Sequence, residues 1–356
     1  MTRRSSRRQH NAPTIADVAR DAGVSPMTVS RVINGENNVR AATRDAVNES
    51  IRRLNYAPNP AARSLAGAGQ LRVALLYSNP SAGFLSEFLV GSLEQASRTD
   101  TQLIVEKCDT GDDVLKVAQH LIDRGIDGVI LPPPLNERAE LLDLLDGAHL
   151  PTVLVASGQP PDSQLAVSID NRQAAFTMTS HILALGHRRI GFIEGDANQT
   201  ASAARLNGYR DALAAAQLPF DPALVTRGLF TYRSGLDAAE ALLALADPPS
   251  AIFSSNDDMA AATVAVAHRR GLDVPGDVTV CGFDDTTLST AIWPELTTIH
   301  QPIADMSRAA LDMLVTSIRR REVPPSAEVR HRVLDFTLIR RQSDAAPRQR
   351  PHSSPA

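Results

Sequence analysis

One short segment near the start of the chain combines an arginine with small polar side chains at helical spacing. A projection at about 100° per residue separates two faces. The apolar face holds Val29, Val32 and Ile33, and the opposite face, which contains no acid, holds Met27, Ser30, Arg31 and Asn34. Arginine can donate two hydrogen bonds to guanine O6 and N7, and hydroxyl and amide groups can hold phosphates, so this face suits a major groove. The alternative is a solvated polar face on a small helical hairpin.

A second group of candidate residues follows short apolar runs later in the chain, where predicted strands end. These positions are Ser78-Asn79, Asp109, Ser157, Glu194-Gly195, Phe230, Asn256-Asp257 and Asp284-Asp285. In open parallel sheets, ligands bind outside the carboxyl ends of the strands. We therefore expect a binding site where these side chains meet.

Catalytic signatures are absent from the sequence, which contains no Walker A, GxGxxG, GxSxG or HExxH motif. The nine His residues are scattered, without the paired spacing of metal ligands. Cys108 and Cys281 are isolated, with no CxxC motif and no Cys/His spacing for zinc. We expect a binding protein without a cofactor or a metal, and not an enzyme.

The arginine-bearing face requires a helix, and residues 14–34 predict a pair of them. Thr14 with Asp17 three residues later is typical of a capping box, and Gly23 ends the first helix as a C′ glycine does. Ser25-Pro26 begins the second helix, with Ser at the N-cap and Pro at the first helical position. Two short helices joined by a tight turn with Gly form a helix-turn-helix.

A third helix is predicted over residues 42–54 and would close a three-helix domain. After a break at Tyr56–Pro60, a helix over residues 61–66 begins at Asn59-Pro60 and ends at Gly67. A helix this short does not persist alone in water. Its single large apolar residue is Leu65, and a plain linker is the alternative interpretation.

The strand-end residues require sheets, and from residue 71 onward strand-like runs alternate with amphipathic helices. The runs cover residues 71–77, 102–109, 127–133, 151–157, 189–195, 223–230, 250–256 and 278–285. Nearly continuous Val, Ile and Leu in strands between helices indicates parallel sheets covered on both faces. Eight strands in two groups of four predict an α/β body of two similar lobes.

Charge divides the chain in the same way. Residues 1–65 carry eleven Arg and five acids, a net charge of +6, while the remainder carries 25 basic and 35 acidic residues, a net charge of −10. A basic head on an acidic body indicates a polyanionic partner for the head alone. A basic disordered tail is the alternative, because four of the eleven Arg lie in the first eight residues.

Length and composition set the remaining limits. A chain of 356 residues predicts about two to three domains. The sequence has no apolar run of the roughly 18 residues that cross a bilayer. Its Arg/Ser-rich start has no apolar stretch behind it, unlike a secretory signal. We therefore expect the protein in the reducing cytoplasm.

Five motifs in their order along the chain resemble the LacI/GalR family of transcriptional regulators, over about residues 14–341. They read IADVARDAGVSPMTVSRVIN, LNYAPNPAARSLAG, DNRQAAFTMTSHILALGHRRIGFI, SSNDDMA and CGFDDTTLSTAIWPELTTIHQP. The resemblance implies a helix-turn-helix head, a hinge helix, and two lobes like those of periplasmic binding proteins, joined by three crossovers.

The resemblance also implies domain boundaries. We expect a disordered basic tail at 1–12, the helix-turn-helix domain at 13–58, the hinge at 59–69, the effector-binding core at 70–341 and a disordered tail at 342–356. Within the core, the N-lobe would cover about 70–185 and 299–328, and the C-lobe about 186–298 and 329–341.

For the head, the resemblance implies base reading at Pro26, Met27 and Arg31, with phosphate contacts from Ser30 and Asn34. Leu65 matches a hinge leucine that wedges into the minor groove and kinks the duplex. The full set of expected DNA contacts is Thr14, Ser25, Pro26, Met27, Thr28, Ser30, Arg31, Asn34, Asn59 and Leu65. The chain departs from some relatives at Pro26 and Met27, which donate no hydrogen bond, so Arg31 is the strongest expected base reader. Arg40 stands where relatives often have a Ser N-cap for the third helix.

For the body, the resemblance implies a pocket between the lobes. The expected effector contacts are Phe84, Leu85, Asp170, Ser202, Arg205, Phe230, Asn256 and Asp284. Asp, Asn and Arg bind neighbouring hydroxyls in pairs and an aromatic ring covers an apolar sugar face, so the set suits a polyol. Structural roles are the alternatives: helix or turn caps for Asp170 and Asp284, an interlobe ion pair for Arg205, and core packing for Phe84 and Phe230. Asp257 is expected to be a helix cap.

Together these features predict a homodimeric transcriptional repressor. Two heads would bind a pseudo-palindromic operator, since a twofold dimer requires matched half-sites. A small ligand, a sugar or sugar derivative, would close the lobes and weaken DNA binding. A corepressor-type regulator, in which ligand tightens DNA binding, and a solute-binding protein that does not bind DNA are the alternatives. The final tail has no heptads, so no tetramerisation coil is expected.

Overall fold

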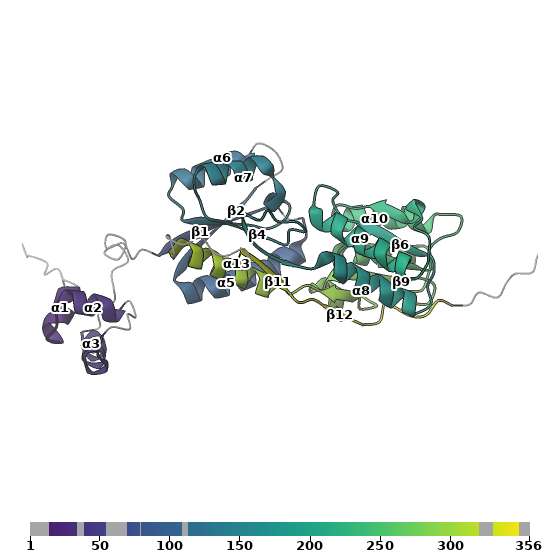
Figure 1. Ribbon diagram of the computed structural model, residues 1–356. Coiled ribbons are helices and arrows are strands. Elements are labelled where there is room, and N and C mark those ends of the chain that lie inside the picture. Colours follow the sequence, from purple (N-terminus) through teal and green to yellow (C-terminus); the bar gives the residue numbers. More distant parts are fainter. Residues whose placement is uncertain are drawn as a thin grey trace, which may run out of the picture. The chain divides into compact units, whose positions relative to one another are not determined.

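The computed structural model describes residues 14–33, 39–54, 70–78, 80–108, 113–319 and 330–348. The chain divides into two compact units, Met1–Gln70 and Leu71–Ala356, which we call the head and the body. Figure 1 shows the helices of the head and the two lobes of the body.

The head contains three helices, α1 (Ile15–Asp21), α2 (Pro26–Ile33) and α3 (Ala41–Arg53). The capping box is present, because Thr14 accepts from the Asp17 backbone N–H and the Asp17 carboxylate accepts from the Thr14 N–H. Gly23 has a φ of +65°, and the Val24 N–H reaches back to the Ala19 carbonyl, which ends α1. Ser25 accepts from the Thr28 N–H at the start of α2. The predicted starts of the first two helices and the stop at Gly23 are thus confirmed.

Apolar side chains from all three helices form the core of the head. Val18, Val29 and Val47 are fully buried at its centre. The α3 helix begins at Ala41 without a side-chain cap from Arg40, as the absence of a Ser there suggested. The predicted helix over residues 61–66 lies outside the described residues.

The first lobe of the body is a six-stranded parallel sheet in the order β11-β5-β4-β3-β1-β2. Its strands are β1 (Leu71–Tyr77), β2 (Thr101–Lys107), β3 (Gly128–Leu131), β4 (Thr152–Val155), β5 (Leu165–Ile169) and β11 (His331–Leu334). One face packs against α5 (Ala82–Thr99) and α13 (Ile303–Arg319), and the other against α6 (Asp113–Asp123) and α7 (Ala139–Gly147). A short 3-10 turn, η1 (Leu135–Glu137), follows β3.

The second lobe is a six-stranded sheet in the order β12-β10-β9-β8-β6-β7, parallel except for β12. Its strands are β6 (Ile190–Glu194), β7 (Val225–Arg227), β8 (Ala251–Ser254), β9 (Thr279–Asp284), β10 (Thr297–His300) and β12 (Thr337–Ile339). Its helices are α8 (Asn171–Ala184) and α9 (Thr200–Ala215) on one face and α10 (Tyr232–Leu243) and α11 (Asp257–Arg269) on the other. Short turns η2 (Pro222–Leu224) and α12 (Leu288–Ala291) complete it. The predicted fold class is confirmed.

All eight predicted strands are present, and four further strands, β5, β10, β11 and β12, occur among the described residues. The chain crosses between the lobes after β5, after β10 and after β11. The predicted lobe boundaries were wrong in two places. The α8 helix packs on the second sheet and not in the N-lobe, because its apolar residues join those of α9 and β6. The β11 strand belongs to the first lobe and not to the C-lobe, because it pairs with β5.

The prediction of a disordered tail from residue 342 was also wrong for residues 342–348. Ser343 and Asp344 are buried against the second lobe. Ser343 donates to the Val280 carbonyl, and Asp344 accepts from Thr297 and His181. This segment lies against β9 and β10 because its backbone and hydroxyl groups satisfy polar groups there. Residues 349–356 lie outside the described residues.

Candidate functional sites

The exposed face of α2 is the first candidate site. Ser25, Pro26, Met27 and Arg31 are exposed, and Thr28 and Ser30 are partly exposed. The side chain of Met27 is 64% exposed, which is unusual for a residue of this size and leaves it available for an apolar contact. The predicted contacts Asn34, Asn59 and Leu65 lie outside the described residues.

Some of these polar groups already bind one another within the head. The Ser25 and Thr28 hydroxyls are 2.9 Å apart, and Thr14 donates to Asp17 at 2.7 Å. Both contacts stabilise helix starts, so the structural role of Thr14 and Ser25 is evident and a DNA contact by either remains a prediction.

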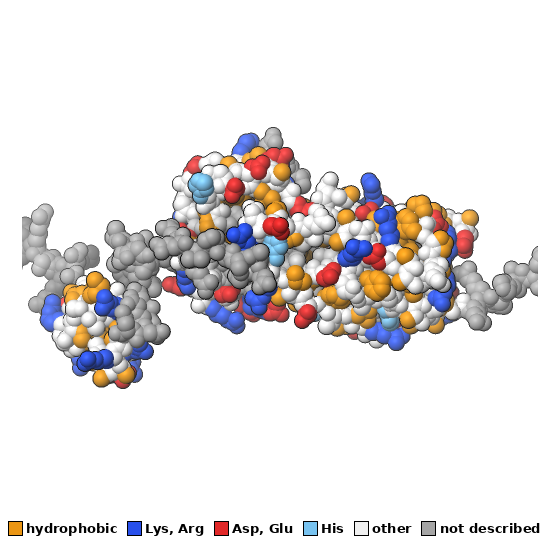
Figure 2. Space-filling model, in the orientation of Figure 1, with side chains coloured by type: hydrophobic (Ala, Val, Ile, Leu, Met, Phe, Trp, Pro, Cys, Tyr) orange, Lys and Arg blue, Asp and Glu red, His pale blue; other side chains and the backbone are white. Residues whose placement is uncertain are grey.

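Both acids of α1 are held in ion pairs. Asp17 pairs with Arg20, and Asp21 pairs with Arg53 and accepts from Ser50, which joins α1 to α3. The hydrogen bond from Arg53 is the main cause that lowers the pKa of Asp21 below its ordinary value. Figure 2 shows Arg side chains on the visible face of the head. Because eleven arginines stand against five acids in residues 1–65, the head can present positive charge to a polyanion.

The second candidate site is a pocket between the two lobes of the body, enclosing about 420 Å³ that is partly open to solvent. It is lined by Pro80, Ser81, Phe84, Pro133, Ala156, Gln199, Ala201, Arg205, Phe230, Asn256, Asp284 and Gln301. These residues stand at or soon after the carboxyl ends of β1, β3, β4, β6, β7, β8, β9 and β10. The pocket therefore lies where open parallel sheets place ligands.

Arg205 on α9 is held rigidly at one wall of the pocket. Its Nε donates to Asn171 Oδ1 at 2.9 Å, and its Nη1 donates to the Ser255 carbonyl. The guanidinium lies 3.6 Å from the centre of the Phe283 ring, in a cation–π contact. Burial lowers the pKa of Arg205 to about 10, so it stays charged at neutral pH. A charged group fixed in this way is preorganised to bind ligand oxygens.

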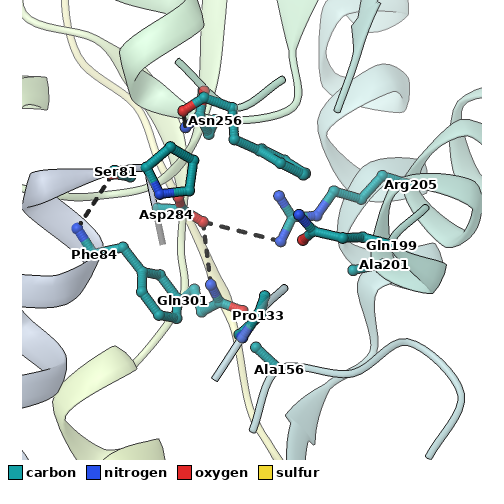
Figure 3. A pocket seen from close by; sticks show the side chains of 12 residues that line it. Ser81, Phe84, Pro133, Ala156, Gln199, Ala201, Arg205, Asn256, Asp284 and Gln301 are labelled. Carbon is teal, nitrogen blue, oxygen red and sulfur yellow. Dashed lines mark hydrogen bonds and ion pairs between the residues drawn. The ribbon is translucent and has the colours of Figure 1, made fainter. Parts of the chain in front are cut away.

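Asp284 faces Arg205, with 3.9 Å between its Oδ1 and Arg205 Nη2 (Figure 3). The same Oδ1 accepts from Gln301 Nε2 at 3.1 Å, whereas Gln301 Oε1 is buried without a partner. Burial raises the pKa of Asp284 well above its ordinary value, and the charge of Arg205 opposes that rise. The carboxylate, the amide and the guanidinium form a converging polar set that matches neighbouring hydroxyl groups.

The backbone is strained at three pocket residues. Ala156, Phe230 and Asp284 have φ angles of +56°, +56° and +105°, in the region that favours glycine. Phe230 lies directly over Gly195, where an added Cβ would be 2.0 Å from the ring. Strain of this kind persists only when surrounding structure enforces it and is concentrated at binding sites.

Asn256 and Asp257 stand at the start of α11 and have different surroundings. The Asn256 side chain accepts from the Met259 N–H as the N-cap, donates to the Phe230 carbonyl and lines the pocket. Asp257 does not line the pocket; it is fully buried and accepts from Thr286 and Thr298. Burial raises its pKa to about 7. The prediction that Asp257 is a helix cap was wrong, because Asn256 is the N-cap of α11 and the Asp257 carboxylate instead binds β10 and the loop after β9.

The structure brings together five of the eight predicted effector contacts: Phe84, Arg205, Phe230, Asn256 and Asp284. Three do not line the pocket. Asp170 is exposed and caps α8 by accepting from the Gln173 N–H, Leu85 is half-buried on α5, and Ser202 is buried on α9 with a hydroxyl that has no partner. The cap alternative considered for Asp170 is therefore the role that the structure supports.

Seven lining residues were missed from the sequence, among them Gln199 and Gln301. Gln301 directly follows β10, a strand that we did not predict, so its position at a strand end was hidden. Pro133 and Ala156 lie at the ends of predicted strands and could have been found by the same strand-end rule that identified Asp284.

The described residues contain no cluster of three or more His, Cys, Asp or Glu that could hold a metal ion. Within the same residues, no helix has the length and hydropathy of a membrane span. The two sites are thus a basic helical head and a polar pocket.

Comparison with known proteins finds matches for both the head and the body of the chain. Residues 14–59 match the family described as bacterial regulatory proteins, lacI family, and residues 179–343 match the periplasmic binding protein-like domain. Catabolite control protein A of Priestia megaterium is 35% identical over 323 residues, covering 90% of this chain and 97% of that protein. The HTH-type transcriptional regulator CelR of Thermobifida fusca is 36% identical over 322 residues, covering 88% and 94%.

Solved structures of transcriptional regulators are also similar to this chain. A complex of the transcriptional regulator CelR with cellobiose has a TM-score of 0.72 at 34% identity and covers 93% of this chain and 99% of that one. The lac repressor dimer bound to operator and the anti-inducer ONPF has a TM-score of 0.71 at 25% identity and covers 94% and 100%.

Proposed function

Because the chain belongs to the lacI family of bacterial regulatory proteins and is a DNA-binding transcriptional regulator, we propose that it is a repressor controlled by a sugar. Two copies bind a pseudo-palindromic operator through their heads. A sugar or sugar derivative binds between the lobes of each body and changes the affinity of the heads for DNA. The protein acts in the bacterial cytoplasm, where its DNA target lies, and acts by binding and not by catalysis.

The observation that carries the proposal is the polar set of Arg205, Asp284 and Gln301 in the pocket of a chain that also carries a helix-turn-helix. The free carbonyl oxygen of Gln301 and the fixed guanidinium of Arg205 offer an acceptor and a donor to adjacent hydroxyls. Phe84 and Phe230 add apolar surface for the ring of a sugar. The cellobiose complex of CelR, at 34% identity, supports a carbohydrate as the ligand class.

At the head, Arg31 reads a guanine in each half-site and Met27 contacts an apolar base edge, such as a thymine methyl group. Both side chains are exposed on the acid-free face of α2. The other Arg residues of the head add phosphate contacts that weaken as salt rises.

The sign of the response has two possibilities. An inducing sugar lowers operator affinity, whereas a corepressing ligand raises it. The test is fluorescence anisotropy of a labelled duplex from the chain's own promoter region, at several salt concentrations, with cellobiose and a panel of mono- and disaccharides. Loss of DNA binding on adding sugar supports induction, and a gain supports the corepressor alternative.

Asp284→Asn is the matched variant for this test, because it keeps the shape of the side chain and the contact to Gln301 but removes the charge facing Arg205. We expect operator affinity to stay unchanged and the response to sugar to be lost. A chain that binds no DNA at low salt contradicts the repressor function. An operator complex that no sugar in the panel affects contradicts the ligand class.

A further inference from the structure

Side-chain contacts join the two lobes beside the pocket, in addition to the three chain crossovers. One group of contacts, which we call the Glu137 latch, connects Glu137 and residues 157–159 of the first lobe to Thr200 of the second. Glu137 Oε2 accepts from the Thr200 N–H at 2.7 Å, and Oε1 accepts from the Thr200 hydroxyl at 2.6 Å. The Thr200 hydroxyl also accepts from the N–H groups of Gly158 and Gln159, at 2.9 and 3.1 Å.

The latch replaces a cap that α9 lacks. Gln199 occupies the N-cap of α9, but its side chain makes no cap hydrogen bond. The backbone N–H of the first helical residue, Thr200, is instead bound by a carboxylate from the other lobe. Negative charge is stabilising at a helix N-terminus. Because the carboxylate and the helix belong to different lobes, this stabilisation is present only while the lobes are together.

The helix held in this way also carries ligand-binding groups. Ala201 and Arg205 of α9 line the pocket, as does Gln199 directly before it (Figure 3). Gly158 lies against the backbone of Thr200, where an added Cβ would be 2.6 Å from the carbonyl carbon. Separation of the lobes would therefore move Arg205 away from the groups of the first lobe that complete the pocket.

A second interlobe contact lies at the start of α5. Ser81, which is buried and lines the pocket, donates to Asp258 Oδ2 of α11 at 2.7 Å. Beside it, Gly83 packs on Thr286, where an added Cβ would be 2.9 Å from the Thr286 Cβ. The two lobes are thus in contact beside the pocket in two places. Ser81 of the second contact lines the pocket, whereas neither Glu137 nor Thr200 of the Glu137 latch does.

We propose that Glu137 is a positioning residue, which holds the lobes together over the bound ligand and so sets how long the ligand remains, without touching it. This inference rests on the proposed function. Breaking the latch would speed ligand dissociation by a similar factor for every ligand that the pocket takes. Changes of lining residues such as Arg205 would instead alter which ligands are preferred.

The test uses the full-length protein and cellobiose as the probe, with dissociation rates measured by stopped flow. Glu137→Gln removes one acceptor and the charge, and we expect about tenfold faster dissociation, the size of one charge-assisted hydrogen bond, with little change in association. Thr200→Val removes the hydroxyl and should give the same effect, whereas Thr200→Ser keeps the hydroxyl and should release cellobiose at the wild-type rate. The variant with both Glu137→Gln and Thr200→Val should release cellobiose no faster than either single variant. Glu140→Gln, an exposed carboxylate on α7, is the matched control and should leave the rate unchanged.

Amide hydrogen exchange without ligand supplies a second readout. Gly158 and Gln159 N–H groups bind Thr200 and not Glu137. Faster exchange at these two amides in Glu137→Gln therefore reports that the lobes separate, and unchanged exchange overturns the proposal. An unchanged dissociation rate of cellobiose overturns it as well. If cellobiose does not bind the wild-type chain, the choice of sugar fails, and the exchange measurement decides the latch by itself.

Discussion

Buried ionisable side chains of the body have two different tasks. Arg205 and Asp284 face the pocket, where their charges are open to a ligand. Asp257 has a structural task, because its carboxylate accepts hydrogen bonds from Thr286 and Thr298 of its own lobe. Residue type and position at a strand end do not distinguish a ligand-facing carboxylate from a structural one, because both Asp257 and Asp284 follow apolar strands in the sequence.

At the head, Arg31→Ala is expected to weaken operator binding by about 1–3 kcal/mol and to relax the preference at one base position in each half-site. The reason is loss of the two hydrogen bonds that the arginine side chain can donate to guanine. Binding to operators with each base substituted in turn measures the preference. Arg233→Ala, which removes an exposed arginine from α10 of the body, is the control and should change nothing. An unaltered base preference in Arg31→Ala would contradict the assignment.

Asp257 gives a pH-dependent prediction. Its folded-state pKa of about 7 lies above the ordinary 3.8, so the folded protein keeps this proton while the unfolded chain loses it. The free energy of unfolding is therefore highest below about pH 4 for this group and falls as the pH rises to about 7, by at most roughly 4 kcal/mol. Asp257→Asn should flatten this slope, because an amide does not titrate and still accepts from Thr286.

Urea unfolding of the body between pH 4.5 and 8 tests this slope. Asp211→Asn is a control of opposite sign, since the hydrogen bond from Arg172 lowers the pKa of Asp211. Its contribution to stability is present above the unfolded pKa and is lost as the pH falls. A variant at position 257 with the wild-type slope would show that Asp257 does not cause it.

At the scale of elements, close helix packing fixes the frame of each lobe. The α5 and α13 helices approach at Gly91, where an added Cβ would lie 2.1 Å from the Ala304 carbonyl oxygen and 2.2 Å from Ser307 Oγ. The α5 helix carries Phe84 and follows β1, and α13 follows β10; both strands end near the pocket. Their spacing therefore controls the position of the first lobe's half of the site.

Gly91→Ala is expected to destabilise the body by about 1–3 kcal/mol, because α5 must move away from α13. In an open helix the same change would stabilise by roughly 0.5–1 kcal/mol. Gly147→Ala at the end of α7 is the matched control, since an added Cβ meets nothing within 4 Å there. Thermal unfolding of the two variants measures the difference. Equal effects would mean that the contact between α5 and α13 yields without cost.

At the scale of the whole molecule, the two functions are carried by separate units. The basic head and the acidic body are different compact units, and the net charge of −4 describes neither of them. A regulator built in this way needs a thermodynamic coupling between ligand binding in the body and DNA binding by the head.

That coupling must be reciprocal. If a sugar changes operator affinity by some factor, operator DNA must change the affinity for that sugar by the same factor. We expect titrations of sugar into free protein and into the operator complex to differ by the ratio found from DNA titrations with and without sugar. The same titrations with a scrambled duplex are the control. Unequal factors would mean that a further equilibrium, such as subunit assembly, intervenes.

The sequence by itself determined the features that depend on local chemistry. The capping box at Thr14, the stop at Gly23 and the start at Ser25 follow from short-range hydrogen bonds and backbone preference, and all are present. The eight predicted strands and the two-lobed α/β fold follow from apolar periodicity. Three of the expected pocket residues, Phe230, Asn256 and Asp284, meet because strand ends converge in parallel sheets, whereas Phe84 and Arg205 lie on helices and were implied by the resemblance.

Only the tertiary structure decided which lobe each late segment joins and which polar residues face the pocket. The β11 and β12 strands are short and half-exposed, so their pairing depends on partners far away in the sequence. Gln301 reaches the pocket because β10 lies beside β9, and Glu137 reaches Thr200 because two lobes meet. Contacts between residues 63 positions apart leave no periodic trace in the sequence, since they arise from the packing of whole elements.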